Sequence, residues 1–482
     1  MQSAAQCGMM KAKNGGPSGL PPKIENAPKQ ENAMNTKAPK LDTKRTVLIG
    51  CAFLSICAFW QMYNSVIPLI LTNTFHLNET WSGVIMAADN ILALFLLPLF
   101  GGISDRCKAK MGRRKPFILL GTIAAVVLML LLPLLDDSYF TAAATWKLVA
   151  FIGALGALLV AMGTYRSPAV ALMPDVTPKP LRSKGNAIIN LMGALGGILY
   201  LIITSVLYSQ ARTAGKDHVS YTLLFMIVAG IMLLALAVLL CTVDEPALDK
   251  KAAAYEALHP EENLAVTDAA GNQSLPPQVK KSLGFLLVSI ALWFIGYNAM
   301  ETWFTTYAQK MWNMALGSAT LCLTIATLGA IITYIPSGIL AEHIGRKKTI
   351  LGGVALLAAS FLAAFVYTCF FHTFHTVLYL LFALVGVAWA LINVNSLPMV
   401  VEMCKGSDVG KFTGLYYTFS MAAQTVTPIA AGALLNHIGY ETLFPYATVF
   451  VALAFITMQF VRHGDNKAAG KRGLDAFSDL DN

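Results

Sequence analysis

The sequence reads Gly101-Gly-Ile-Ser-Asp105-Arg106-Cys-Lys-Ala-Lys-Met-Gly112-Arg113-Arg114 at the junction of two long apolar runs, residues 80–104 and 116–135. A related stretch, Gly338-Ile-Leu-Ala-Glu342-His-Ile-Gly345-Arg346, stands at the end of a later apolar run. The step from the first glycine to the acid is the same in both, and the offset between them is 237 residues. A second repeated feature pairs Asp175 with Glu402 at an offset of 227 residues. Repeated motifs in corresponding positions indicate a duplicated architecture.

The composition excludes most classes of soluble protein. The 482 residues are 56% hydrophobic and 13% charged, and the mean hydropathy is +0.60. Soluble domains carry about 25% charged residues, so this chain has too little charge to cover a surface that faces water. The composition excludes a soluble enzyme, a disulfide scaffold and a disordered chain, and it predicts a polytopic membrane protein.

Twelve apolar stretches are each long enough to cross a hydrocarbon layer of about 30 Å as a helix. They lack the alternating pattern of barrel strands, and helices satisfy their own backbone groups in lipid. We therefore predict an all-α membrane protein with twelve transmembrane helices in two six-helix pseudo-repeats. The predicted spans are residues 46–74, 80–104, 116–135, 147–173, 184–211, 219–243, 282–309, 316–341, 348–371, 375–402, 410–435 and 441–462.

Polar segments divide the chain into five parts. We predict a disordered cytoplasmic tail over residues 1–45 and a first six-helix bundle over 46–243. A cytoplasmic central loop follows at 244–281, then a second six-helix bundle at 282–462 and a cytoplasmic tail at 463–482.

The basic residues predict the orientation of the spans. With the N-terminus in the cytoplasm, 30 of the 35 Lys and Arg residues lie on the cytoplasmic side, as the positive-inside rule requires. The net charge of +9 therefore reports topology, and no nucleic-acid partner is expected. We predict a multi-pass protein of the plasma membrane, with both termini in the cytoplasm and with the lipid bilayer as its surroundings.

The duplicated motif, glycine followed by an acid and then by a glycine and basic residues, resembles the signature of the major facilitator superfamily. A plain positive-inside loop is the alternative, and two copies at matched spacing disfavour it. Glycine allows close helix packing, the acid suits a helix N-terminus, and the basic cluster holds the loop in the cytoplasm. The predicted gating residues are Gly101, Asp105, Arg106, Gly112, Arg113, Arg114, Gly338, Glu342, Gly345 and Arg346.

The first half carries a more specific resemblance. Its loop, Gly102-x2-Asp105-Arg106-Cys107-x4-Gly112-Arg113-Arg114-x-Pro116-Phe117, is similar to that of the sucrose–proton symporters and, more loosely, of the glycoside–pentoside–hexuronide–cation symporters. Tyr165-Arg166-x5-Leu172-x2-Asp175 resembles span 4 of the sucrose symporters. The resemblance implies transport of a sugar or glycoside with a coupling cation. Leu155, Ala93 and Leu97 stand where these families carry acidic residues, so the coupling ion stays open.

Three ionisable residues lie inside predicted spans, where a charge costs roughly 2.5–3.5 kcal/mol. Asp89 in span 2 and Glu301 in span 7 occur at similar depths, one in each half, and Arg166 lies in span 4. A carboxyl group in a low-dielectric environment binds a proton more readily than one in water. Glu301 is therefore the first candidate for proton coupling and Asp89 the second. The alternative for each is a structural role within the bundle.

Polar and aromatic residues recur at helical spacing in spans 1, 7 and 10, which line the central cavity in the family that the motif resembles. Span 7 carries a stripe with a spacing of four residues, and span 10 carries Trp389 near two asparagines. Amides and rings of this kind suit the hydroxyls and faces of a sugar, although they also join helices. The predicted substrate-binding residues are Trp60, Gln61, Asn64, Asn90, Arg166, Trp293, Tyr297, Asn298, Asn393 and Asn395.

Sequence motifs for nucleotide, metal or nucleophile chemistry are absent, so neither an enzyme, a cofactor nor a metal site is predicted. We predict a secondary transporter that works by alternating access, moves a sugar or glycoside with a proton or other cation, and functions as a monomer. An exporter of amphipathic compounds is the main alternative. A non-transporting sensor on the same fold is disfavoured because the tail and central loop are short.

The charge distribution generates a topology test. In a cysteine-free protein, a cysteine placed at residue 138 should react with an impermeant reagent added outside the cell. A cysteine at residue 262 should react only after the membrane is permeabilised. The reverse pattern would overturn the predicted orientation.

Overall fold

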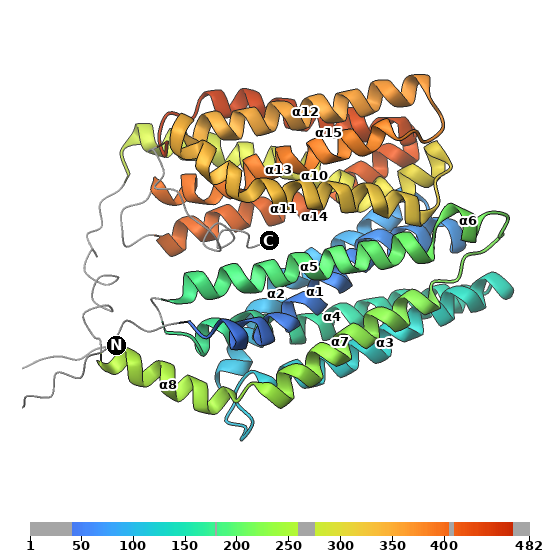
Figure 1. Cartoon of the computed structure of the whole chain (residues 1–482). Coiled ribbons are helices and arrows are strands. Elements are labelled where there is room, and N and C mark those ends of the chain that lie inside the picture. Colours follow the sequence, from blue (N-terminus) through green and yellow to red (C-terminus); the bar gives the residue numbers. More distant parts are fainter. Residues whose placement is uncertain (1–40, 179–180, 259–274, 404–408, 466–482) are drawn as a thin grey trace, which may run out of the picture. The chain divides into compact units, whose positions relative to one another are not determined.

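The computed structural model describes residues 41–178, 181–258, 275–403 and 409–465, and these ranges contain helices and loops but no strand (Figure 1). Within them, twelve helices are long and apolar enough to cross a membrane, which confirms the predicted all-α fold. The elements are α1 (Thr43–Leu69), η1 (Ile70–Thr74), α2 (Glu79–Asp105), α3 (Lys115–Thr141), α4 (Thr145–Asp175), α5 (Arg182–Leu207), α6 (Gln210–Thr213), α7 (Thr222–Thr242), α8 (Glu245–Leu258), α10 (Pro277–Trp312), α11 (Leu316–Ile344), α12 (Arg346–Phe370), α13 (Val377–Glu402), α14 (Val409–His437), η3 (Tyr440–Thr442) and α15 (Leu443–Gln459).

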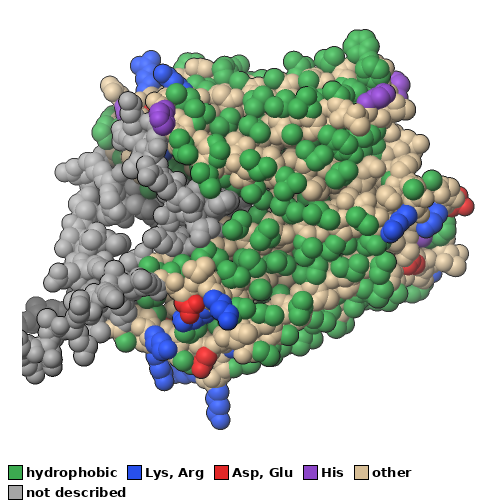
Figure 2. All heavy atoms as spheres, viewed as in Figure 1, with side chains coloured by type: hydrophobic (Ala, Val, Ile, Leu, Met, Phe, Trp, Pro, Cys, Tyr) green, Lys and Arg blue, Asp and Glu red, His purple; other side chains and the backbone are tan. Residues whose placement is uncertain are grey.

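The surface agrees with a membrane environment. Large apolar side chains point outward from the helices, and Phe95, Ile332 and Phe370 are 65%, 72% and 75% exposed. Figure 2 shows apolar side chains across the middle of this face and most charged side chains near its two ends. Such a band would be costly in water but matches the hydrocarbon layer of a bilayer.

Two of the predicted polar segments differ from the structure. Of the predicted tail, residues 1–40 lie outside the described ranges, and α1 begins at Thr43 with the Asp42 side chain accepting a bond from the Arg45 backbone. Within the predicted central loop, Glu245–Leu258 forms the helix α8, whereas residues 259–274 lie outside the described ranges. This segment is polar but rich in good helix formers, so low hydropathy alone was a poor guide to a loop.

The helix α3 continues six residues beyond the predicted span end at residue 135. Its last turns hold Asp136, which is 0% exposed. Lys147 at the start of α4 donates hydrogen bonds to the carbonyl oxygens of Ser138 and Ala142 at 2.8 and 2.7 Å. These bonds satisfy carbonyl groups at the α3 C-terminus, where a helix has no partners of its own.

Two large hydrophobic cores organise the helices. One is formed mainly by α1–α7, and the other is formed by α10–α15. Figure 1 shows these two sets, in blue to green and in yellow to red. We call them the N-half and the C-half. The N-half and C-half contact each other through the helix pairs α1–α10, α2–α14 and α5–α11.

Close contacts between the halves depend on small residues at one end of α2 and α14. A Cβ atom on Gly83 would lie 2.2 Å from the Pro428 carbonyl oxygen, and one on Gly432 would lie 2.3 Å from the Glu79 oxygen. Only glycine permits α2 and α14 to approach so closely. Gly83 is near the start of α2, and residues 106–114, which include five Lys and Arg residues, follow the other end of this helix. We call the end of the bundle with Gly83 and Gly432 the distal end, and the opposite end the basic end.

Hydrogen bonds reinforce the distal end. The Asn73 amide donates to Gln309 Oε1 at 2.7 Å, and the Tyr440 hydroxyl donates to Glu79 Oε1 at 2.5 Å. At the basic end, by contrast, every ion pair given for the described ranges joins elements of the same half. Among the described residues, the hydrogen bonds given between the halves therefore lie toward the distal end.

Candidate functional site

The two halves meet at corresponding positions of their first helices. Asn64 of α1 and Glu301 of α10 are separated by 237 residues, which is also the offset between the two copies of the sequence motif. Asn64 Nδ2 donates to Glu301 Oε1 at 3.4 Å. One turn away, the Thr305 hydroxyl donates to the Ser65 carbonyl oxygen at 3.0 Å. A pseudo-twofold arrangement therefore places the half-buried carboxylate Glu301 at the boundary between the halves.

Arg166 is held in α4 by its neighbours in the sequence. The Tyr165 hydroxyl donates to the Ala52 carbonyl oxygen of α1 at 2.9 Å, and the Ser167 hydroxyl donates to the Leu97 carbonyl oxygen of α2 at 2.7 Å. The guanidinium carbon of Arg166 lies 5.6 Å from the centre of the Trp60 ring, a cation–π contact. Among the described residues, Arg166 forms no ion pair. Its five donors are therefore available to another partner.

Asp89 completes a group of three ionisable residues. Its Oδ1 accepts from the Asn90 backbone at 2.6 Å and from the Asn90 amide at 2.9 Å. Coulombic interactions connect Asp89 with both Arg166 and Glu301. The structure thus brings together the three ionisable residues that the sequence placed inside spans. Arg166 lies in the field of Asp89, within its own half, whereas the hydrogen bond of Glu301 is to Asn64.

Aromatic rings lie beside this group. Tyr297 of α10 stacks on Trp389 of α13 with ring centres 3.7 Å apart and an angle of 10° between planes. Trp60 lies edge-on to Tyr63 at 5.4 Å, and the Trp60 indole nitrogen is buried without a hydrogen-bond partner. The N-half thus contributes Trp60 and the guanidinium, and the C-half contributes the stacked pair.

Several predicted substrate residues lie elsewhere or are satisfied within the bundle. Trp293 is 0% exposed and belongs to the C-half core, although it continues the stripe of Tyr297 and Glu301. The Asn298 amide donates to the Phe294 carbonyl oxygen of its own helix. The stripe therefore runs from the fully buried Trp293, whose indole nitrogen has no hydrogen-bond partner among the described residues, to the partly buried Tyr297 and Glu301.

Helix packing accounts for the remaining predicted amides. Asn395 donates to Ser337 Oγ at 3.0 Å and so connects α13 with α11. Asn393 forms a side-chain hydrogen bond with Tyr334. Gln61 lies against α5, where a Cβ on Gly197 would approach its Cγ at 3.4 Å. In this structure, Asn395 and Asn393 join helices in the way that interhelical polar residues commonly do.

The basic end holds a network around Arg114, which is 5% exposed. Its guanidinium binds the Asp105 carboxylate, the Asp175 carboxylate at 2.7 Å and the Ser104 hydroxyl at 2.5 Å. It also donates to the Gly101 carbonyl oxygen at 3.2 Å. The predicted gating residues Gly101, Asp105 and Arg114 are therefore together. They join α2, α3 and α4 within the N-half.

Arg113 and Arg106 occupy more open positions. Arg113 contacts Asp175 at 3.5 Å and Asp249 of α8 at 3.3 Å. Arg106 is exposed. Asp175, which belongs to this network, was paired with Glu402 in the second sequence repeat. Glu402 binds Arg346 in the C-half. The two acids of this sequence repeat therefore each form an ion pair with an arginine of their own half.

Glu245 has a role that was not predicted. Its carboxylate accepts from the backbone N–H groups of Arg113, Arg114 and Lys115 at 2.8, 2.8 and 3.0 Å, and the side chain is 2% exposed. The carboxylate therefore caps the N-terminus of α3, where the helix dipole favours negative charge. Gly112 has a φ of +113°, and a Cβ there would lie 2.3 Å from Glu245 Oε2. Glycine is required at this position on both counts.

The C-half repeats this cap. Asp465, just after α15, accepts from the Lys347 backbone near the start of α12 at 2.9 Å. Gly345 has a φ of +93°, and a Cβ there would lie 2.9 Å from Asp465 Oδ1. Gly338 has open space around it, and the Glu342 side chain lies outside the described residues. An acid directly after the sixth and the twelfth span was the sequence signal for these caps.

Comparisons with known proteins place this geometry in context. A sequence profile described as Major Facilitator Superfamily matches residues 49–319 and 310–477. A sucrose transport protein of Arabidopsis thaliana is 29% identical over 167 residues, which cover 32% of this chain and 28% of that protein. Proton-associated sugar transporter A of Homo sapiens is 27% identical over 186 residues, 38% of this chain and 25% of that protein. The chain thus matches less than a third of the length of these relatives.

A solved structure supports the fold over nearly the whole chain. The crystal structure of a D-xylose–proton symporter superposes with a TM-score of 0.62 and 15% identity, and it covers 88% of this chain and 98% of its own. At this identity the likeness concerns the fold alone.

The cap on α3 generates a stability test. We expect Glu245→Ala to lower the free energy of unfolding by about 1–2 kcal/mol, because three backbone donors lose a charged acceptor. The exposed pair of Asp249 with Arg113 should contribute less than about 0.5 kcal/mol, so Asp249→Ala is the matched control. Thermal unfolding of the purified protein in detergent measures both variants. Equal losses in the two variants would contradict the capping role.

Proposed function

We propose a substrate class and a coupling mechanism for this chain, which belongs to the major facilitator superfamily. The protein is a multi-pass membrane transporter and not an enzyme. We propose that it moves a sugar or glycoside across the plasma membrane by alternating access, in symport with a proton or another cation. Both termini face the cytoplasm in this proposal, and a monomer is the working unit.

The proposed substrate class rests on the guanidinium of Arg166, which forms no ion pair with the described residues. Arg166 is half-buried, and a guanidinium without an ion pair inside a membrane span is costly unless it serves a function. Its planar fork of donors binds neighbouring hydroxyls of a sugar, while Trp60 beneath it holds the side chain in place. The stacked pair Tyr297 and Trp389 adds an aromatic face of the kind that binds the apolar side of a pyranose ring. The names of the sugar-transporting relatives support the same class.

The coupling mechanism rests on the contact between Asn64 and Glu301. A proton on Glu301 removes a negative charge from the boundary between the halves and from the field of Asp89. The balance of charge around Arg166 then changes, because Asp89 is its Coulombic partner. Substrate binding at Arg166 and proton binding at Glu301 are thereby linked through one electrostatic group.

Alternating access requires the two ends of the bundle to exchange roles. The joined distal end, with its close contacts at Gly83 and Gly432, must separate when the basic end closes. The Arg114 network and the Arg346–Glu402 pair keep each half rigid at the basic end, so that the halves move as bodies. This state, joined at the distal end, corresponds to opening toward the cytoplasm under the predicted topology.

The coupling proposal is tested with Glu301→Gln. The amide mimics the protonated acid and keeps the contact with Asn64, so exchange of internal for external substrate should continue while uphill accumulation is lost. Uptake of labelled disaccharides into vesicles, with and without a pH gradient, measures both activities. Asp249→Asn, far from the site at the basic end, is the control and should accumulate substrate normally. Normal accumulation by Glu301→Gln would move the role to Asp89 or to another ion.

The substrate proposal is tested with Arg166→Lys and Tyr297→Leu. Lysine keeps the charge but loses the fork, so the affinity for a bound sugar should fall about 10- to 100-fold. Tyr297→Leu should weaken glycosides up to about tenfold and acyclic polyols much less, because only a ring offers a face for stacking. Tyr139→Leu, whose ring packs on Phe75, is the control. A wild-type protein that ignores every sugar tested but binds hydrophobic cations tightly would favour the exporter of amphipathic compounds.

A further inference from the structure

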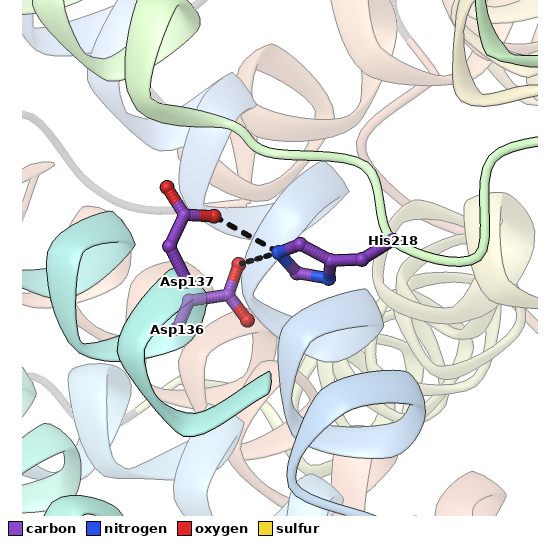
Figure 3. A group of neighbouring side chains, drawn as sticks. All are labelled: Asp136, Asp137 and His218. Carbon is purple, nitrogen blue, oxygen red and sulfur yellow. Dashed lines mark hydrogen bonds and ion pairs between the residues drawn. The ribbon is translucent and has the colours of Figure 1, made fainter. Parts of the chain in front are cut away.

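Three potential metal ligands meet at the distal end of the N-half. Asp136 and Asp137 lie in the last turns of α3, and His218 lies in the segment between α6 and α7 (Figure 3). His218 Nε2 is 2.9 Å from Asp137 Oδ1 and 3.8 Å from Asp136 Oδ2. One ligand atom from each residue lies within 4.8 Å of the other two.

Asp136 provides an independent reason to expect a ligand. Its side chain is 0% exposed, and neither of its carboxylate oxygens has a hydrogen bond of ordinary length and angle. The Thr74 hydroxyl is a neighbouring side-chain donor to this carboxylate, and the imidazole of His218 interacts with it electrostatically. A buried carboxylate with so little hydrogen bonding is costly unless a cation compensates its charge. The cation must come from the direction of His218, because Figure 3 shows the carboxylate turned toward that ring.

We propose that Asp136, Asp137 and His218 bind a divalent transition-metal ion, with zinc as the best match. Two ligands of a tetrahedral zinc ion at bond lengths of about 2.0–2.1 Å stand about 3.4 Å apart. The distances of 2.9 and 3.8 Å lie on either side of this value, so small side-chain shifts bring both into range. Imidazole with carboxylates suits zinc and its neighbours in the transition series, whereas magnesium and calcium prefer oxygen ligands alone. Water would complete the coordination.

Neighbouring residues orient the ligands. Asp137 Oδ2 accepts from the Ser220 hydroxyl at 2.7 Å and from the Thr222 hydroxyl at 3.0 Å, which leaves Oδ1 directed at His218. The His218 ring stacks on Phe140 with centres 4.4 Å apart and an angle of 13°. Partners of this kind fix the orientation of metal ligands and raise the affinity of the site.

A metal here would tie α3 to the segment that also joins the two halves. The backbone N–H of Ala315 in the C-half donates to Gln210 Oε1 at 2.8 Å, and the Gly317 N–H donates to the Tyr208 carbonyl oxygen at 2.8 Å. The bound ion therefore stabilises the joined distal end and slows the return to the other state. This effect on transport rests on the proposed alternating access, whereas metal binding itself does not.

Binding is tested on the full chain, purified in detergent, freed of its affinity tag and treated with chelator. Calorimetric titration with Zn²⁺ should show one site, and Zn²⁺ should raise the unfolding temperature with increasing concentration, whereas Mg²⁺ should not. His218→Gln and Asp136→Asn should each weaken Zn²⁺ binding at least about tenfold. His372→Gln is the matched control, because this histidine is exposed in the loop between α12 and α13, and it should bind Zn²⁺ as the wild type does.

Asp136→Asn separates loss of the site from loss of the fold. The neutral amide removes an uncompensated buried charge, so the metal-free variant should unfold at the same or a higher temperature than the metal-free wild type while losing its response to Zn²⁺. Wild-type protein that does not bind Zn²⁺, or variants that bind it undiminished, would overturn the proposal. Because the readouts are binding and unfolding, they are independent of whether the protein transports sugars.

Discussion

Charge inside a hydrocarbon layer is costly, at roughly 2.5–3.5 kcal/mol for each ionised group near the centre. This constraint accounts for the placement of nearly all the charged side chains discussed above. At the basic end, Arg114 is satisfied by carboxylates and a hydroxyl, and Glu245 by three backbone donors. Against this background Arg166 and Asp136 stand out, because each is poorly compensated by the described residues. We propose a sugar as the ligand of Arg166 and a metal ion as the ligand of Asp136.

Duplication is the second organising feature, and it is chemical as well as topological. In each half, a glycine with a positive φ precedes the third long helix, and an acid that follows the sixth long helix caps the N-terminus of this third helix. In each half, an arginine also binds an acid at the end of the fourth long helix. The two halves therefore have the same internal framework at the basic end. Their differences are concentrated in the middle, where the N-half carries Asp89 and Arg166 and the C-half carries Glu301.

The two ends of the bundle have different physical characters. The distal end is joined by glycine contacts and by two hydrogen bonds between the halves, one between amides and one from a tyrosine to a carboxylate, and water can replace the partners of such bonds when the ends separate. The basic end is held by charged networks inside each half, which resist separation. A transporter that rocks between two states needs rigid halves with an interface that can open. The proposed zinc site joins α3 to the segment between α6 and α7, and the bond between Gln210 of α6 and Ala315 connects the beginning of that region with the C-half.

The sequence alone determined the class of protein, the number of spans and the repeated motif. Hydropathy and charge are summed over many residues, so a wrong assignment of a few residues does not change these results. It also identified Asp89, Arg166 and Glu301, since a charge within an apolar run is conspicuous without a structure. Only the tertiary structure decided which polar residues face each other. Trp293 and Tyr297 share one stripe in the sequence, yet Trp293 is fully buried in the C-half core whereas Tyr297 is partly buried and stacks on Trp389 at the edge of that core. Asp136 and His218 are 82 residues apart, and no local pattern connects them, because their proximity depends on how α3 packs against α7 and the segment before it.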